Sequence, residues 1–292
     1  MPKIPFSGLL LDLLRATRKS RLAMIGLCIL IAYAIMAIIG PIVVPLDITS
    51  KWEKRLLGPS LEHPLGTDYA GRDVFSQIIH GSRDVLIVGT LASLFSVLIA
   101  VLIGTPAGYV GGAISAGLDT LMNILLTIPS FPVMLIFASF FKAQDPITLS
   151  LILSIWMWAA LARAIRAQVI EMREREFVEA LRCLGLPSLH IIFREILPNL
   201  APYIVINFIK NLREAITACV GMMFLGIARY SPTNWGVMLN LAFIHYGVVY
   251  SAPLGLSYVL SPLLAMVFLQ FGAICFSRGI EEVVAPRLRE YE

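Results

Sequence analysis

Few residues of this chain are able to do chemistry, and most of them gather in one charged stretch, residues 173–199. The sequence contains no Gly-rich loop ending in Lys-Ser or Lys-Thr for nucleotide phosphates, no G-x-S-x-G turn and no paired His at metal spacing. Its cysteines are scattered and indicate neither a disulfide framework nor a metal site: Cys28, Cys183, Cys219 and Cys275. We therefore expect no catalytic residue, no metal and no cofactor in this chain.

The charged stretch is predicted to form two short helices joined by a turn. Its apolar residues recur at three- and four-residue spacing along one stripe: Phe177, Ala180, Leu181 and Leu184. Gly185 follows them and can take the left-handed conformation that ends a helix. Ser188 is a candidate N-cap of the second helix, which Pro198 is expected to close. The result is an elbow with an apolar edge and a charged rim, and a loop lying along the lipid headgroups is the alternative.

A second charged group interrupts an otherwise apolar segment and consists of Lys210, Arg213 and Glu214. Charges at the bilayer centre cost roughly 2.5–3.5 kcal/mol on insertion scales, so they usually face a cavity or a partner. Lys210 and Glu214 are four residues apart and are expected to pair on one helix face. Two interpretations stay open: the three line a translocation path, or they lie near the inner headgroups or at a subunit seam.

The elements around these residues are those of an all-α membrane protein, because 58% of the residues are hydrophobic and only 14% are charged. The segment 1–21 is basic, and the uncharged run 22–46 is long enough to span the bilayer. A polar loop, 47–84, precedes a core over 85–277 that holds five further spans. The first four of these spans are expected near 85–112, 120–141, 146–162 and 201–225. The sixth span of the chain is expected near 253–276, before the tail 278–292.

The distribution of basic residues predicts the orientation of these six spans. With both termini inside, fourteen of the 23 Lys and Arg residues face the cytoplasm, whereas seven lie outside. This bias agrees with the positive-inside rule. It also puts the elbow, near 176–197, in the cytoplasm. We expect a multi-pass protein of the plasma or inner membrane, in contact with lipid and not with nucleic acid.

The order Glu179-Ala180-Leu181, then Gly185, then Leu197-Pro198 resembles the EAA loop of ABC-transporter permeases. Leu181 stands where that family usually has Ala, and Glu195 where it usually has Ile. The resemblance implies the fold of a type I importer permease, in which this loop is the coupling helix that fits a groove on an ATPase subunit. It also implies that ATP and Mg are bound by two partner ATPase subunits and not by this chain.

The first loop carries a more specific string, from His63 to Arg83, in which a helix is expected to begin at Thr67 or Asp68 and to end at Gly81. The string resembles the C-type permease subunit of dipeptide, oligopeptide and nickel importers. Its motif residues here are Gly66, Thr67, Asp68, Gly71, Arg72 and Asp73. The resemblance implies a second, homologous permease subunit and an extracytoplasmic substrate-binding protein.

Peptides are the expected cargo, with oligosaccharides or nickel as alternatives for the same machinery. The family tends to carry an acid shortly before Phe224-Leu-Gly, where this chain has Cys219, so no ligand preference is carried over from the family on this position. A secondary transporter is the alternative from another class, but no inverted repeat is visible in the sequence. A membrane-bound enzyme or anchor is disfavoured by the lack of clustered catalytic groups.

Overall fold

The computed structural model describes residues 17–228, 231–245 and 256–284, and their regular structure is helical apart from one isolated bridge between Thr67 and Asp73. Five helical segments are long and apolar enough to cross a membrane. They are α2 (Arg21–Val43), α3 (Val74–Tyr109), α6 (Pro146–Arg173), the continuous segment Ser188–Phe224 that ends in α9 (Leu197–Phe224), and α12 (Leu256–Val284).

A sixth crossing is made only if two bent helices are counted together. Helices α4 (Gly112–Thr127) and α5 (Ser130–Phe140) meet at an angle of 85°. The prediction of a single helix over 120–141 is therefore wrong. Pro129 causes the break between the two helices. The proline ring disfavours a helical conformation for the residue before it, and Ile128 is extended, with ψ of 128°. The described residues thus contain five candidate spans, or six with this broken pair.

Helix α3 begins earlier than expected and is not interrupted. Asp73 caps its first turn, because its side chain accepts a hydrogen bond from the Ser76 amide at 2.7 Å. The prediction of a helix that ends at Gly81 is therefore wrong, since α3 runs through Gly81 to Tyr109. Gly81 instead permits a close approach, because a Cβ there would lie 2.1 Å from the Thr233 carbonyl oxygen.

Small residues and interhelical hydrogen bonds hold the spans together. A Cβ at Gly104 would lie 2.5 Å from the Ala162 carbonyl oxygen, so α3 and α6 pack with their backbones close together. Helices α2 and α12 meet in the same way, because a Cβ at Gly26 would lie 2.3 Å from the Phe276 nitrogen. Asn211 of α9 donates to Ser96 of α3 at 3.0 Å. Both devices are typical of helix pairs in lipid.

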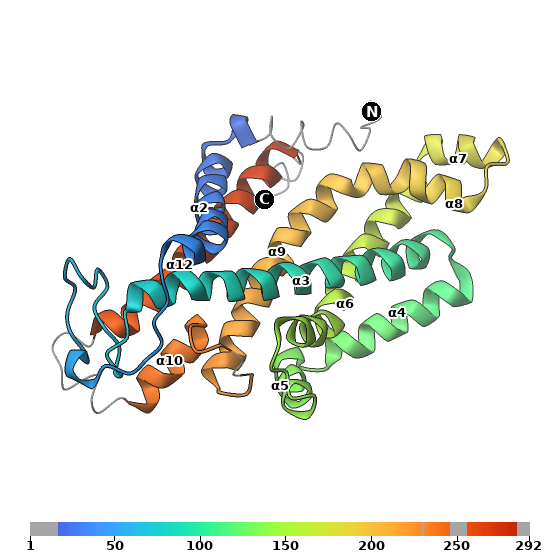
Figure 1. Ribbon diagram of the computed structural model, residues 1–292. Coiled ribbons are helices and arrows are strands. Elements are labelled where there is room, and N and C mark those ends of the chain that lie inside the picture. The colour runs from blue at the N-terminus through green and yellow to red at the C-terminus, as the bar shows by residue number, and fades with distance from the viewer. Residues whose placement is uncertain (1–16, 229–230, 246–255, 285–292) are drawn as a thin grey trace.

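Figure 1 shows that the two segments singled out from the sequence lie at opposite extremities of the molecule. The elbow, with α7 (Glu176–Cys183) and α8 (Ser188–Ile191), occupies one end. The loop between α2 and α3, which includes the short helix η1 (Trp52–Lys54), occupies the other. A shorter apolar helix, α10 (Trp235–Ile244), packs at that second end, where Trp235 donates to the Ile78 carbonyl oxygen at 3.1 Å. The spans therefore separate the elbow from the loop.

Candidate functional site

The elbow turns at Gly185, which has the left-handed conformation expected from its position, with φ of +74°. The Leu186 amide donates to the Leu181 carbonyl oxygen at 3.3 Å, and the Gly185 amide donates to that of Arg182 at 2.9 Å. This pair of bonds is the Schellman motif that ends a helix. A Cβ at Gly185 would meet nothing within 4 Å, so the backbone conformation alone makes glycine the favoured residue.

One side of the elbow is buried against the helical core. Val178 of α7 is fully buried, as are Ile191 of α8 and Ile196 of the following π-helical turn, η2 (Ile192–Ile196). These three belong to the same apolar cluster as Tyr109 at the end of α3. The elbow is therefore packed onto the bundle as a body and is not a loose loop.

Two arginines tie the elbow and the end of α6 to α3. The Arg182 guanidinium lies 4.8 Å from the ring centroid of Tyr109, and its Nε is 3.4 Å from the Tyr109 hydroxyl. Arg173 donates to the Tyr109 carbonyl oxygen at 3.4 Å. These contacts join the elbow to the ends of α3 and α6.

The other side of the elbow presents apolar side chains outward. Leu184, Leu189 and Phe193 are 76%, 69% and 60% exposed, and Phe177 and Ala180 are exposed as well. We call Phe177, Leu184, Leu189 and Phe193 the elbow patch. Of the stripe expected from the sequence, only Leu181 packs inward, and Val178 supplies the buried contact instead. Large apolar side chains exposed together on one short segment are typical of an interaction site.

The closing residues of the motif lie inside a helix and do not end one. The turn η2 runs without a break into α9, so the expectation that Pro198 closes the second short helix is wrong. Pro198 lies in the first turn of α9, where the missing N–H of proline is tolerated. Leu197 is partly buried against the same cluster, whereas Glu179 is exposed. Gly185 of the motif therefore lies in a turn, Leu197 and Pro198 lie at the start of α9, and Glu179 lies on the exposed surface.

The charges of α9 are not arranged as expected. Lys210 pairs with Glu281 of α12 at 2.5 Å, so the expected pairing with Glu214 is wrong. A Lys that precedes its Glu by four residues is the weaker orientation of such a pair, and the longer-range partner wins. Arg213 is partly buried, and its carbonyl oxygen accepts from Gln270 of α12 at 3.1 Å. Glu214 is exposed.

An ion pair that the sequence did not reveal joins α4 and α6. The Arg166 guanidinium lies 3.2 Å from the Asp119 carboxylate. Arg166 also donates to the Ser115 hydroxyl at 3.3 Å. Asp119 lies well inside α4. Asp119 is the one acid of α4, whereas α6 also carries Arg163 and Arg173, so the sequence does not single out Arg166 as its partner.

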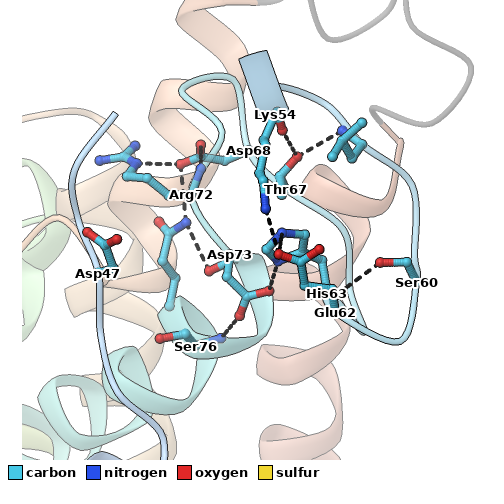
Figure 2. A network of polar contacts seen from close by, with 12 residues as sticks. Asp47, Lys54, Ser60, Glu62, His63, Thr67, Asp68, Arg72, Asp73 and Ser76 are labelled. Carbon is cyan, nitrogen blue, oxygen red and sulfur yellow. Dashed lines mark hydrogen bonds and ion pairs between the residues drawn. The ribbon is translucent and has the colours of Figure 1, made fainter. Parts of the chain in front are cut away.

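The motif of the first loop builds a folded cap at the start of α3, shown in Figure 2. The Asp68 side chain is fully buried and accepts from the Arg72 side chain at 2.7 Å and from Gln77 at 3.1 Å. It also accepts from the amides of Ala70 and Arg72. Burial opposes the charge of Arg72, but the Asp68 carboxylate outweighs this effect and raises the pKa of Arg72.

The remaining motif residues shape the same cap. Thr67 donates to the Lys54 carbonyl oxygen at 2.5 Å, and Asp73 lies 3.0 Å from the imidazole of His63 (Figure 2). Gly66 and Gly71 both have positive φ, and a Cβ at Gly71 would lie 1.9 Å from the Lys51 carbonyl oxygen. These contacts give the motif a structural role. His245, which follows α10, stacks on Tyr69 of this cap with ring centroids 3.9 Å apart.

Comparison with known families places two models on this chain. The one described as "Binding-protein-dependent transport system inner membrane component" matches residues 97–290. The one described as "N-terminal TM domain of oligopeptide transport permease C" matches residues 8–59.

Three relatives with assigned names match most of the chain. The dipeptide transport system permease protein DppC of Bacillus subtilis is 34% identical over 231 residues, which cover 78% of this chain and 72% of the relative. The protein of the same name from Alkalihalophilus pseudofirmus is 29% identical over 276 residues, or 93% and 88% of the two chains. The oligopeptide transport system permease protein OppC of Bacillus subtilis is 27% identical over 287 residues, or 96% and 90%.

Proposed function

Because this chain belongs to the family of binding-protein-dependent transport system inner membrane components, as a dipeptide/oligopeptide permease, we propose that it forms half of the pathway of an ATP-driven importer of di- and oligopeptides. The peptide cargo is supported by the names of the relatives, which are dipeptide and oligopeptide permeases. The membrane role is supported by the five helical segments that are long and apolar enough to span.

The elbow is the surface on which an ATPase subunit docks, and the elbow patch is the observation that carries this proposal. Four large apolar side chains stand outward at one end of the molecule, while the opposite side of the same elbow is packed on the helical core. Movement of a docked subunit would therefore act on an elbow that is packed against the helical core and not on a flexible loop. The Arg182–Tyr109 contact would pass this motion to α3.

The remaining partners are those that membership of this permease family suggests. A second, homologous permease completes the pathway, and two ATPase subunits bind ATP and Mg on the cytoplasmic side. An extracytoplasmic binding protein delivers the peptide at the end where the cap of the first loop lies. Both termini are cytoplasmic, as the excess of basic residues on that side favours. The complex resides in the plasma or inner membrane.

Co-purification tests the docking surface. The variant Leu184→Glu/Leu189→Glu puts two charges into the elbow patch and is expected to lose the ATPase subunits during purification of the complex. The control is Leu61→Glu in the first loop, because Leu61 is also an exposed leucine but its loop lies at the other end of the molecule. If the elbow variant retains its ATPase subunits as the control does, the elbow patch is not the docking surface.

A further inference from the structure

Helix α9 differs from the other spans in the kind of side chain that it exposes. Between Leu197 and Met223 the exposed residues are Glu214 and Thr217, and no large apolar side chain of this stretch is exposed. The other long spans, by contrast, expose many: Ile35 and Ile38 of α2, Leu98 and Leu102 of α3, Leu151 and Ile155 of α6, Val267 and Phe268 of α12. The open face of α9 is therefore not suited to lipid.

The carboxylate of Glu214 lies near the middle of the membrane-spanning part. On the inner side, Ile206 packs with Ala23, which lies at the start of α2. On the outer side, α9 ends at Phe224. At 1.5 Å per residue, Glu214 is about 12 Å from Ile206 and about 15 Å from Phe224 along the helix. Its neighbours Leu212 and Ile216 pack at Gly89, inside the uncharged part of α3.

Within the part of the chain that the structure describes, no cation neutralises Glu214. Lys210, one turn away, is engaged with Glu281 of α12. Helix α12 also supplies Gln270, but its amide donates to the Arg213 carbonyl oxygen and to the Thr217 hydroxyl. An acid at this depth facing lipid would cost roughly 2.5–3.5 kcal/mol on insertion scales, so such a residue faces water or a partner group.

We propose that Glu214 faces the aqueous pathway and binds the ammonium group of the peptide as it passes. This inference rests on the proposed function, because peptides are the cargo that carries an ammonium group at one end. A carboxylate accepts charge-assisted hydrogen bonds from an ammonium group. The other exposed residue of this helix face, Thr217, lies one turn beyond Glu214. One such contact retains the cargo briefly without trapping it.

Transport by the complete importer in proteoliposomes, with dialanine as cargo, tests this role. Loss of one charge-assisted hydrogen bond is expected to lower the uptake rate of Glu214→Gln roughly tenfold. The variant Glu214→Asp keeps the charge and is expected to stay within about threefold of the unaltered importer. Uptake by Glu214→Gln at the unaltered rate would overturn the proposal, and so would loss of the second permease from this variant, since Glu214 would then belong to a subunit seam.

A labelling experiment separates contact with cargo from a structural role. In a Cys28→Ser/Cys183→Ser background, the thiol of Glu214→Cys is expected to react with a hydrophilic sulfonatoethyl thiosulfonate, and saturating dialanine is expected to slow the reaction. The control Val267→Cys lies on the exposed apolar face of α12 and is expected not to react. An unreactive thiol, or one that dialanine does not protect, contradicts the inference. Failure of the unaltered importer to take up dialanine instead contradicts the proposed function first.

Discussion

The Arg182 guanidinium lies 4.8 Å from the centre of the Tyr109 ring, so a charged residue of the elbow rests on the last residue of the central helix α3. Tyr109 is buried, whereas Arg182 is exposed. A cation–π contact at such a site contributes about 0.5–1 kcal/mol. The two residues are 73 positions apart in the sequence, so the contact joins distant parts of the chain. It joins the proposed ATPase-docking surface to the spans.

Removing the ring of Tyr109 is expected to loosen this link. Tyr109→Leu loses the cation–π contact, and the amount of peptide moved per ATP hydrolysed should fall about two- to fivefold, the equivalent of the contact's energy. Tyr109→Phe keeps the ring and loses only the hydroxyl, which is 3.4 Å from Arg182 Nε, so it should behave as the unaltered chain. Parallel measurement of uptake and ATP turnover checks this, and equal coupling ratios for Leu and Phe would refute the link.

The turn of the elbow is expected to depend on backbone conformation alone. Gly185→Val forces a β-branched residue to φ of +74°, although no neighbour lies within 4 Å of the added Cβ. Transport-linked ATP turnover should be lost while membrane insertion persists. Gly185→Asn is the matched variant, because Asn tolerates the left-handed conformation, and it should retain most of the turnover. Unaltered coupling in the Val variant would show that the turn need not be preserved.

The cap of the first loop should depend on its buried ion pair. Asp68→Asn leaves the Arg72 side chain, which is 10% exposed, without its counter-charge. Removal of one partner from a buried pair costs about 3 kcal/mol, so thermal unfolding in detergent should begin at a clearly lower temperature. The control Asp47→Asn removes a pair with Lys51 that is half exposed, and should leave the melting temperature unchanged. Equal melting curves for the two variants would argue against a structural role for Asp68.

The pair formed by Lys210 and Glu281 is expected to behave as a link between α9 and α12. Lys210→Glu puts two acids next to each other and should lower stability, whereas Lys210→Glu/Glu281→Lys restores opposite charges and should recover most of it. Because both side chains are about 40% exposed, the interaction is expected to be about 1 kcal/mol or less. A double-mutant cycle on thermal stability measures it, and strict additivity of the single variants would mean that no link exists.

The features that the sequence predicts well are those set by neighbours in the chain. The turn at Gly185 follows from the end of a periodic run, and the long spans follow from uncharged stretches. The break at Pro129 was also visible locally, because proline constrains the residue before it, but the length of the apolar run 120–141 obscured it. Local rules therefore recover most of the helices and some of their ends.

The features that the sequence did not predict depend on distant partners. Lys210 pairs with Glu281, 71 positions away, and Arg166 pairs with Asp119 across two helices. No spacing rule selects these partners over a neighbour such as Glu214. The elbow is a different case, because the apolar stripe read from the sequence includes Phe177, which is exposed, and leaves out Val178, which is buried. The sequence pattern of an apolar face that binds another subunit is the same as that of a face that packs in the core.

The central claim is that the elbow is cytoplasmic and covered by an ATPase subunit, and Cys183, exposed within the elbow, tests it directly. In a Cys28→Ser background, Cys183 should react with a membrane-impermeant maleimide in inside-out vesicles stripped of ATPase subunits. Rebinding of those subunits should protect it. Reaction only in right-side-out vesicles, or equal reaction with and without the ATPase subunits, would contradict the account.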